Sequence, residues 1–213
     1  MNCDRNSLPL YAVTDRAWLN GRTLSEVVEA ALRGGATCMQ LREKELERSA
    51  FLREAVELSG LCRRYHVPLI VNDDVDVALA SGADGVHIGQ HDAAADEVRR
   101  RIGPDRILGV SAQTVEQAVK AERDGADYLG VGAVFSTGTK PDADDVDYRT
   151  LKAICDAVSI PVVAIGGITE CNLGRLAGSG IDGVAVVSAV FAAEDIESAA
   201  RTLRNAVGKE LNL

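Results

Sequence analysis

The sequence predicts an α/β fold, a (βα)8 barrel, from three observations: a glycine-led phrase that recurs four times, prolines that precede apolar runs, and apolar runs of strand length. The phrase stands at residues 35–37, 82–84, 125–127 and 180–182, where it reads Gly-Ala-Thr, Gly-Ala-Asp twice, and Gly-Ile-Asp. Each copy follows an amphipathic stretch and precedes an apolar run. Its glycine is therefore predicted to end a helix ahead of a strand.

Prolines mark the other four strands, because a strand tolerates a missing N–H at its first residue. These prolines are Pro9, Pro68, Pro104 and Pro161. The predicted strand cores are residues 11–13, 38–41, 69–71, 85–88, 107–110, 128–131, 162–165 and 183–187. Several are nearly continuous apolar runs, which is typical of parallel strands covered on both faces. Eight strands favour a single-domain TIM barrel over residues 1–213 rather than an open doubly wound sheet.

Helices are predicted between the strands from their start signals. Thr23 is followed three residues later by Glu26, and Thr114 by Gln117. Such pairs satisfy the free N–H groups of a first helical turn, so helices are expected to begin at both places and to alternate with strands along the chain.

Composition limits the function classes. The chain has 213 residues, 46% of them hydrophobic, and a formal net charge of −9, which argues against a nucleic-acid or anionic-membrane surface. Neither a membrane-spanning apolar run nor a signal-peptide layout is present in the sequence, so a cytoplasmic location is expected. The five cysteines are too widely spaced for a redox pair or a zinc knuckle, and buried thiols are predicted.

In a barrel of this kind the active site lies at the carboxyl ends of the strands. Gln40, Arg42 and Lys44 follow the second strand and alternate on one face, since side chains in a strand have period two. Two inward cations need an anion, and phosphate is the expected one. A solvated charged loop is the alternative, and it suits Glu43 and its acidic neighbours better.

Acidic residues follow the carboxyl ends of two neighbouring predicted strands. Asp73 and Asp92 are predicted to bind Mg²⁺, because oxygen ligands in twos commonly hold this ion together with phosphate and water. Asn72 is expected to bond a phosphate oxygen beside them, and Lys140 is expected to face them across the barrel mouth. Acidic loop residues are often merely solvated, so the nearby cations strengthen the prediction.

A second phosphate site is predicted after the last two strands. Gly166 and Gly167 would let backbone N–H groups approach an anion, and Ser188 begins a short segment after strand eight, where barrels of this fold bind phosphate. His66 is expected at the surface, and His87 is expected to be buried or to support the site rather than to act as a catalytic base; His91 lies in the mouth loop, where a direct role stays open.

Taken together, the motifs resemble those of the thiamine phosphate synthase family. They are YAVTD at 11–15, MQLREK at 39–44, VND at 71–73, GVHIGQ at 85–90, GVSA at 109–112, DYLGVG at 127–132, TGTK at 137–140 and AIGGI at 164–168. The resemblance implies a transferase that joins a hydroxymethylpyrimidine diphosphate to a hydroxyethylthiazole phosphate and releases pyrophosphate. Its implied mechanism is dissociative and assisted by Mg²⁺.

The resemblance also implies roles for individual residues. Diphosphate ligands would be Gln40, Arg42, Lys44, Asn72 and Lys140, with Mg²⁺ on Asp73 and Asp92. Ser111 would lie near the pyrimidine and its leaving group, and would act in catalysis with Arg42, Lys44 and Lys140. The thiazole phosphate would contact Thr137, Thr139, Gly167, Val187 and Ser188.

Two positions depart from the family pattern, and three alternatives stay open. Gln113 stands where a histidine is common, and Asp74 where a basic residue is often found. A thiazole tautomerase and a non-catalytic binder of thiazole phosphate share this barrel, and an aldolase or epimerase could use Lys140 as a Schiff-base amine. Small phosphorylated heterocycles are the expected partners, and the sequence leaves a homodimer open.

Overall fold

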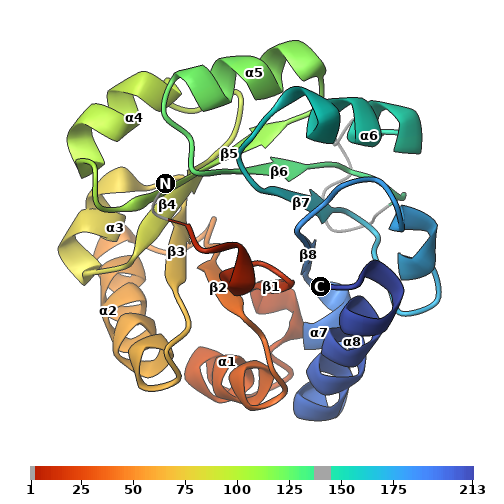
Figure 1. Cartoon of the computed structure of the whole chain (residues 1–213). Coiled ribbons are helices and arrows are strands. Elements are labelled where there is room, and N and C mark those ends of the chain that lie inside the picture. Colours follow the sequence, from red (N-terminus) through yellow and green to blue (C-terminus); the bar gives the residue numbers. More distant parts are fainter. Residues whose placement is uncertain (1–2, 137–144) are drawn as a thin grey trace.

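The protein forms a closed barrel of eight parallel strands in chain order, β1 to β8, as the sequence predicts (Figure 1). The computed structural model describes residues 3–136 and 145–213. The strands are β1 Leu10–Val13, β2 Cys38–Leu41, β3 Leu69–Asn72, β4 Gly85–Ile88, β5 Ile107–Ala112, β6 Tyr128–Val131, β7 Val162–Ile165 and β8 Gly183–Val186.

Helices surround this barrel (Figure 1). The α-helices are α1 Leu24–Arg33, α2 Arg48–Arg64, α3 Val75–Ser81, α4 Ala95–Ile102, α5 Val115–Arg123, α6 Tyr148–Ala157, α7 Ser188–Phe191 and α8 Ile196–Leu211, and the 3-10 helices are η1 Arg5–Ser7, η2 Arg16–Trp18 and η3 Leu173–Leu176. The predicted capping signals begin α1 and α5. Among the described residues, no helix is long and apolar enough to cross a membrane.

The connection between β7 and β8 differs from the predicted pattern of alternating strands and helices. It contains only the 3-10 helix η3 in place of an α-helix. Residues 166–182 are rich in glycine, and Gly178 and Gly180 have φ of 76° and 93°. A helix interior does not accommodate such left-handed residues, so this segment covers the barrel without a full helix.

The recurring phrase couples neighbouring strands. In each copy the third residue accepts, through its side-chain oxygen, the backbone N–H of the first or second residue of the strand before it. The pairs are Thr37 with Leu10 (2.9 Å), Asp84 with Leu69 (2.8 Å), Asp127 with Leu108 (2.9 Å) and Asp182 with Val162 (2.9 Å). These oxygens satisfy donors at the amino ends of β1, β3, β5 and β7, which explains why the phrase precedes every second strand.

Asp127→Ala is expected to destabilise the fold. Asp127 is 6% exposed, accepts the Leu108 N–H and forms an ion pair with Arg99. Its removal leaves a buried N–H and a partly buried guanidinium without this partner, which costs about 3 kcal/mol of unfolding free energy. Chemical denaturation measures the loss. The exposed pair Asp96–Arg100 gives the control, because Asp96→Ala should change the free energy by less than about 1 kcal/mol.

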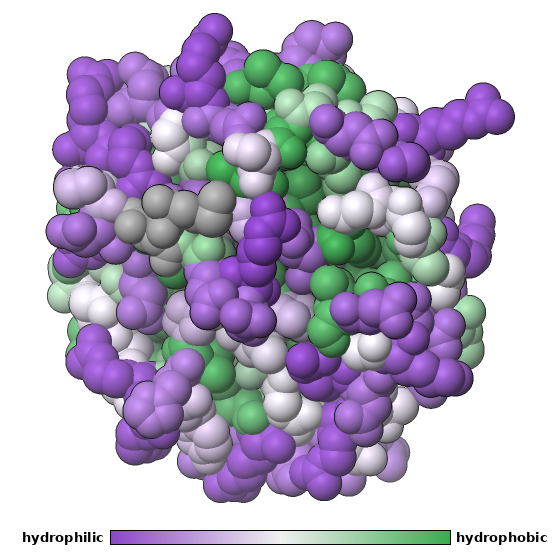
Figure 2. Space-filling view, viewed as in Figure 1, coloured by the Kyte–Doolittle hydropathy of each residue, from purple (hydrophilic) through white to green (hydrophobic). Residues whose placement is uncertain are grey.

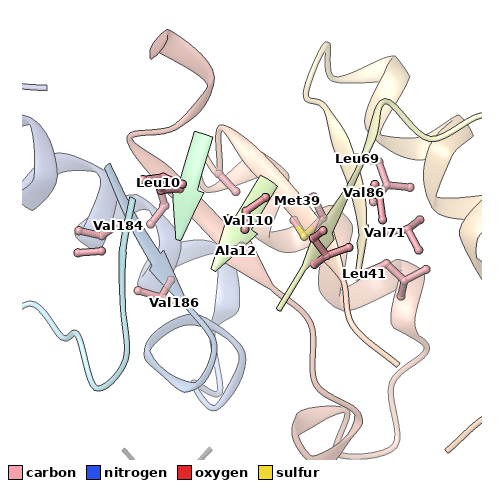
Figure 3. Close-up of a cluster of buried hydrophobic side chains, with 14 of the residues drawn as sticks. Leu10, Ala12, Met39, Leu41, Leu69, Val71, Val86, Val110, Val184 and Val186 are labelled. Atoms are coloured by element: carbon pink, nitrogen blue, oxygen red, sulfur yellow. The ribbon is translucent and has the colours of Figure 1, made fainter. Parts of the chain in front are cut away.

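The strands alternate between two apolar layers. One layer faces the helices and includes Leu10, Met39, Leu41, Val71 and Val186, which Figure 3 shows with others of the set. The second fills the barrel interior and includes Cys3, Leu8, Tyr11, Val13, Cys38, Ile70, Ile107, Tyr128, Val163 and Ala185. Odd and even positions of one strand therefore belong to different layers, as the period of two requires.

The amino ends of the strands are closed by the N-terminal segment. Arg5 on η1 forms an ion pair with Asp182 and donates from Nη2 to the Ser159 carbonyl at 2.8 Å. Figure 1 is viewed from this end, and Figure 2 shows its surface as mostly hydrophilic with small apolar areas between. The polar strand ends that the sequence assigned to function lie at the opposite end of the barrel.

Candidate functional site

Arg42 is held at the ends of β1 and β2. Its backbone N–H donates to the Thr14 hydroxyl at 3.0 Å, and Thr14 is 2% exposed. Its guanidinium lies 3.7 Å from the Asp15 carboxylate, and 19% of its side chain is exposed. The backbone is thus fixed, while the ion pair that the guanidinium makes with Asp15 is long, so the guanidinium can bind an anion at the barrel mouth.

The loop that carries Lys44 is anchored by a buried carboxylate. Glu43 was expected to be solvated, and this expectation is wrong: its side chain is 4% exposed and pairs with Arg16, which also pairs with Glu54. The Glu43 carboxylate accepts the N–H groups of Lys44 (2.8 Å) and Glu45 (3.1 Å). Burial raises the pKa of Glu43, but these hydrogen bonds and Arg16 outweigh it and lower the pKa overall.

Arg16→Ala is expected to loosen this loop. Glu43 would remain buried without its cation, which costs about 3 kcal/mol of unfolding free energy. Because the loop presents Lys44, a predicted diphosphate ligand, the Michaelis constant for the expected diphosphate should rise while that for a second substrate stays unchanged. Thermal unfolding and steady-state kinetics measure both effects. Equal stability of the variant and the wild type would contradict the anchoring role.

Asp73 and Asp92 come together at the ends of β3 and β4. Desolvation by the surrounding protein and then the charge of Asp92 raise the pKa of Asp73 to about 6, against smaller opposing effects of Asn72 and Arg42. Asp92 is oriented by the Gly89 N–H, which donates to it at 2.7 Å. Four residues from the second, third and fourth strand ends therefore interact in one place.

This pair fits a divalent cation. After desolvation, the negative charge of Asp92 is the next largest cause of the raised pKa of Asp73, and a cation would relieve this repulsion. Over the ranges 3–136 and 145–213 no cluster of three or more histidine, cysteine or acidic residues has metal-binding geometry. Two protein oxygens suit Mg²⁺, which keeps water and phosphate as its other ligands.

Asp74, one of the two departures from the family pattern, is engaged elsewhere. It begins α3, where its carboxylate accepts the Val77 N–H at 2.9 Å, and it lies 3.5 Å from the Arg48 guanidinium. Its negative charge is thus directed at a helix N-terminus and an arginine. Gln113, the other departure, donates its backbone N–H to the Gln117 side chain at 2.7 Å.

Gln40 and Ser111 are the two ends of a polar chain inside the barrel. Gln40 is 6% exposed, so it lies deeper than Arg42. The chain runs from Gln40 through Tyr11, Tyr128 and His87 to Ser111, with successive distances of 2.8, 2.7, 2.9 and 2.9 Å. His87 is buried, as predicted. The two tyrosines were not predicted, although the inward register of their strands is a signal that could have found them.

The Gly166–Gly167 pair has a packing reason of its own. Their φ angles are 104° and 63°, and an added Cβ at Gly167 would lie 2.5 Å from the Ser136 carbonyl oxygen. The glycines therefore allow the loop after β7 to approach the loop after β6. Val187 and the exposed Ser188 follow β8 at the same end of the barrel, and Ser188 begins α7 as predicted.

The remaining candidates divide as follows. Thr137, Thr139 and Lys140 lie outside the described residues, so their roles stay predictions. His66 and His91 are exposed.

Of the free cysteines, Cys3, Cys38 and Cys62 are buried, but Cys155 is partly exposed and Cys171 is exposed, so the prediction of buried thiols is wrong for Cys171.

The fold and this site define a parallel (βα)8 barrel with cationic and acidic groups gathered at the carboxyl ends of its strands. Residues 10–190 match the family described as thiamine monophosphate synthase. The chain belongs to this family, as its motifs predict.

Individual relatives agree. A thiamine-phosphate synthase of Clostridium tetani is 52% identical over 91% of this chain and 93% of its own, and one of Chloroflexus aurantiacus is 54% identical over 92% and 90%. The solved structure of a thiamine phosphate pyrophosphorylase from Pyrococcus furiosus superposes with a TM-score of 0.90 at 42% identity and covers 97% of this chain and 98% of its own. A 3-hexulose-6-phosphate synthase, at 16% identity and a TM-score of 0.65, shares the fold alone.

Proposed function

We infer that the protein couples 4-amino-2-methyl-5-hydroxymethylpyrimidine diphosphate with hydroxyethylthiazole phosphate to give thiamine phosphate and pyrophosphate. Family membership makes it an enzyme of the transferase class, and relatives about half identical to it are named thiamine-phosphate synthases. The observation that supports the substrates best is the meeting of Arg42 with the Asp73–Asp92 pair, because a diphosphate requires both cationic ligands and a metal site.

The diphosphate is assigned to one side of the mouth. Arg42, Lys44 and Asn72 would bind its oxygens together with Lys140, and Asp73 and Asp92 would hold Mg²⁺. Gln40 joins this set through the amide N–H and carbonyl that its bond to Tyr11 leaves unused. Mg²⁺, when bound, supplies positive charge against the diphosphate oxygens.

The thiazole phosphate is assigned to the other side. Gly167, Val187 and Ser188 follow β7 and β8, where (βα)8 barrels bind phosphate, and Thr137 and Thr139 complete the proposed set. The packing role of Gly167 is compatible with this assignment, since a backbone without a side chain can approach both Ser136 and an anion closely.

The reaction is dissociative. The bond between the pyrimidine methylene carbon and the diphosphate oxygen breaks, and its electron pair leaves with the diphosphate. The thiazole nitrogen then donates its lone pair to the methylene carbon and forms the new C–N bond. Arg42 and Lys44 stabilise the negative charge that develops on the leaving group, and Ser111 lies beside the pyrimidine. Catalysis thus depends on stabilising the negative charge of the leaving group rather than on a general base.

A product assay tests this function. With both substrates and Mg²⁺, thiamine phosphate and pyrophosphate should form in equal amounts, and omission of either substrate or addition of a chelator should stop both. Isomerisation of a thiazole carboxylate phosphate without coupling would indicate the tautomerase. Binding of thiazole phosphate without turnover would indicate the non-catalytic relative, and either result would overturn the proposal.

A further inference from the structure

The barrel interior carries a chain of hydrogen bonds that crosses from β2 to β5. Its links join Gln40 Nε2 to the Tyr11 hydroxyl, that hydroxyl to the Tyr128 hydroxyl, Tyr128 to His87 Nδ1, and His87 Nε2 to the Ser111 hydroxyl. Tyr11 and Tyr128 are each 1% exposed. The chain therefore connects two proposed substrate ligands, Gln40 and Ser111, through groups that the proposed reaction does not use.

The first donor gives this chain a direction. An amide nitrogen only donates, so Gln40 donates to Tyr11 and the Tyr11 hydrogen is left for Tyr128. In that direction Tyr128 would donate to His87 Nδ1, 2.9 Å away, which must be unprotonated to accept. A neutral imidazole then carries its hydrogen on the other nitrogen, so His87 Nε2 would donate to Ser111. The Ser111 hydroxyl hydrogen is consequently directed away from the chain.

Glycine provides the space for these links. A Cβ added at Gly109 would lie 2.2 Å from Tyr128 Cζ, 2.3 Å from its hydroxyl and 2.5 Å from His87 Nδ1. At Gly130 it would lie 3.0 Å from His87 Cε1. The pairing of Tyr128 with His87 thus occupies the volume that two strand glycines leave open.

The phenols stay protonated under working conditions. Burial raises the pKa of both Tyr11 and Tyr128 well above its ordinary value, and for Tyr128 the neighbouring Tyr11 adds to the effect. Both hydroxyls therefore remain neutral groups that can each accept one hydrogen bond and donate another.

We propose that Tyr128 is a positioning residue: it fixes His87 as the Nε2–H tautomer and so makes the Ser111 hydroxyl a hydrogen-bond donor to the bound pyrimidine diphosphate. The donor role of Ser111 rests on the proposed function, because it needs the pyrimidine diphosphate as substrate. The tautomer of His87 is a property of the free protein. Tyr11 supports the same direction of donation, since it accepts a hydrogen bond from the Gln40 amide and so has its own hydrogen available for Tyr128.

Nitrogen NMR of the free protein labelled with 15N-histidine tests the tautomer. The sequence has three histidines, so His66→Gln and His91→Gln identify the His87 signals by elimination. The expected spectrum shows a protonated, pyrrole-type Nε2 and an unprotonated, pyridine-type Nδ1. A protonated Nδ1 would mean that the chain runs in the opposite direction and would overturn the proposal.

Two variants then separate positioning from packing. Tyr128→Phe keeps the ring and removes the donor to Nδ1, so both His87 tautomers should be populated and kcat should fall about tenfold. The Michaelis constant for thiazole phosphate should not change. Tyr11→Phe leaves Tyr128 able to donate, so the Nε2–H tautomer should persist and kcat should fall less than about threefold. Equal losses in the two variants would indicate packing alone and contradict the role.

The matched control is Tyr65→Phe. Tyr65 also donates from its hydroxyl to a side chain, Glu29, at 3.0 Å, but it lies outside the barrel. This variant should match the wild type in kcat and in the His87 signals. Wild-type kcat in Tyr128→Phe overturns the positioning role alone, whereas a wild-type protein without turnover overturns the proposed function and the role together.

Discussion

Asp73→Asn is expected to lower kcat/KM by a factor on the order of 10²–10³ and to weaken the response to added Mg²⁺. Asp73 and Asp92 form a repelling pair, and the amide removes one of the two charges that would attract a cation. Titration of initial rates with Mg²⁺ measures the effect. A variant with the wild-type rate and the same dependence on Mg²⁺ would contradict the proposed metal site.

The neighbouring variant Asp74→Asn is the control. Asp74 caps α3 and faces Arg48, and asparagine caps a helix nearly as well as aspartate. Its activity should therefore stay within about twofold of the wild type, because the N-cap bond is kept. The two adjacent substitutions remove the same charge from different surroundings, so they separate a local metal site from a general change in electrostatics.

Asp73→Asn should also make the metal-free protein more stable than the wild type near neutral pH. The folded protein raises the pKa of Asp73 from 3.8 to about 6, so ionisation of this group disfavours folding. Wild-type stability should thus decline relative to Asp73→Asn as the pH rises through that window, and the difference should persist above it. Thermal unfolding with a chelator present measures this. If the stability difference between the two proteins were already fully developed below the lower of the two pKa values, the result would contradict this prediction.

Gly109→Ala is expected to disrupt the barrel interior. The added methyl group would overlap Tyr128 and His87, which are both buried, and neither can withdraw without breaking the bond between them. Overpacking of this kind costs on the order of 1–3 kcal/mol of unfolding free energy, and kcat should fall together with it. Denaturation and steady-state kinetics on the same sample measure both losses.

Gly60→Ala is the matched control for this variant. Gly60 lies on α2, is exposed, and has no atom within 4 Å of an added Cβ. Alanine at such a site stabilises a helix by about 0.5–1 kcal/mol. Opposite signs for the two glycine substitutions are therefore expected. A neutral Gly109→Ala would contradict the close packing of Tyr128 against β5.

Local patterns were sufficient to predict the barrel. The phrase around Asp84 and Asp127 predicts strands because its glycine ends a helix and an apolar run follows at once, and both features lie within a few residues. Proline before an apolar run predicts the strands between. The strand ends then follow from the strands, which is why Arg42 and Asp73 could be assigned to one mouth.

Contacts between distant residues were beyond local patterns. The Tyr11–Tyr128 pair joins positions 117 residues apart, and the burial of Glu43 depends on Arg16 and Glu54 from other segments. A charged residue in a loop suggests solvent unless its partners are known. The η3 segment was missed for a different reason, since alternation along the chain favoured a helix that its glycines do not allow.

A crystal structure with Mg²⁺, pyrophosphate and thiamine phosphate tests the central claim most directly. We expect pyrophosphate on Arg42, Lys44 and Asn72, a cation between Asp73 and Asp92, and the thiazole phosphate at Gly167 and Ser188. Pyrophosphate bound away from Arg42, with no ion between the two carboxylates, would contradict the account.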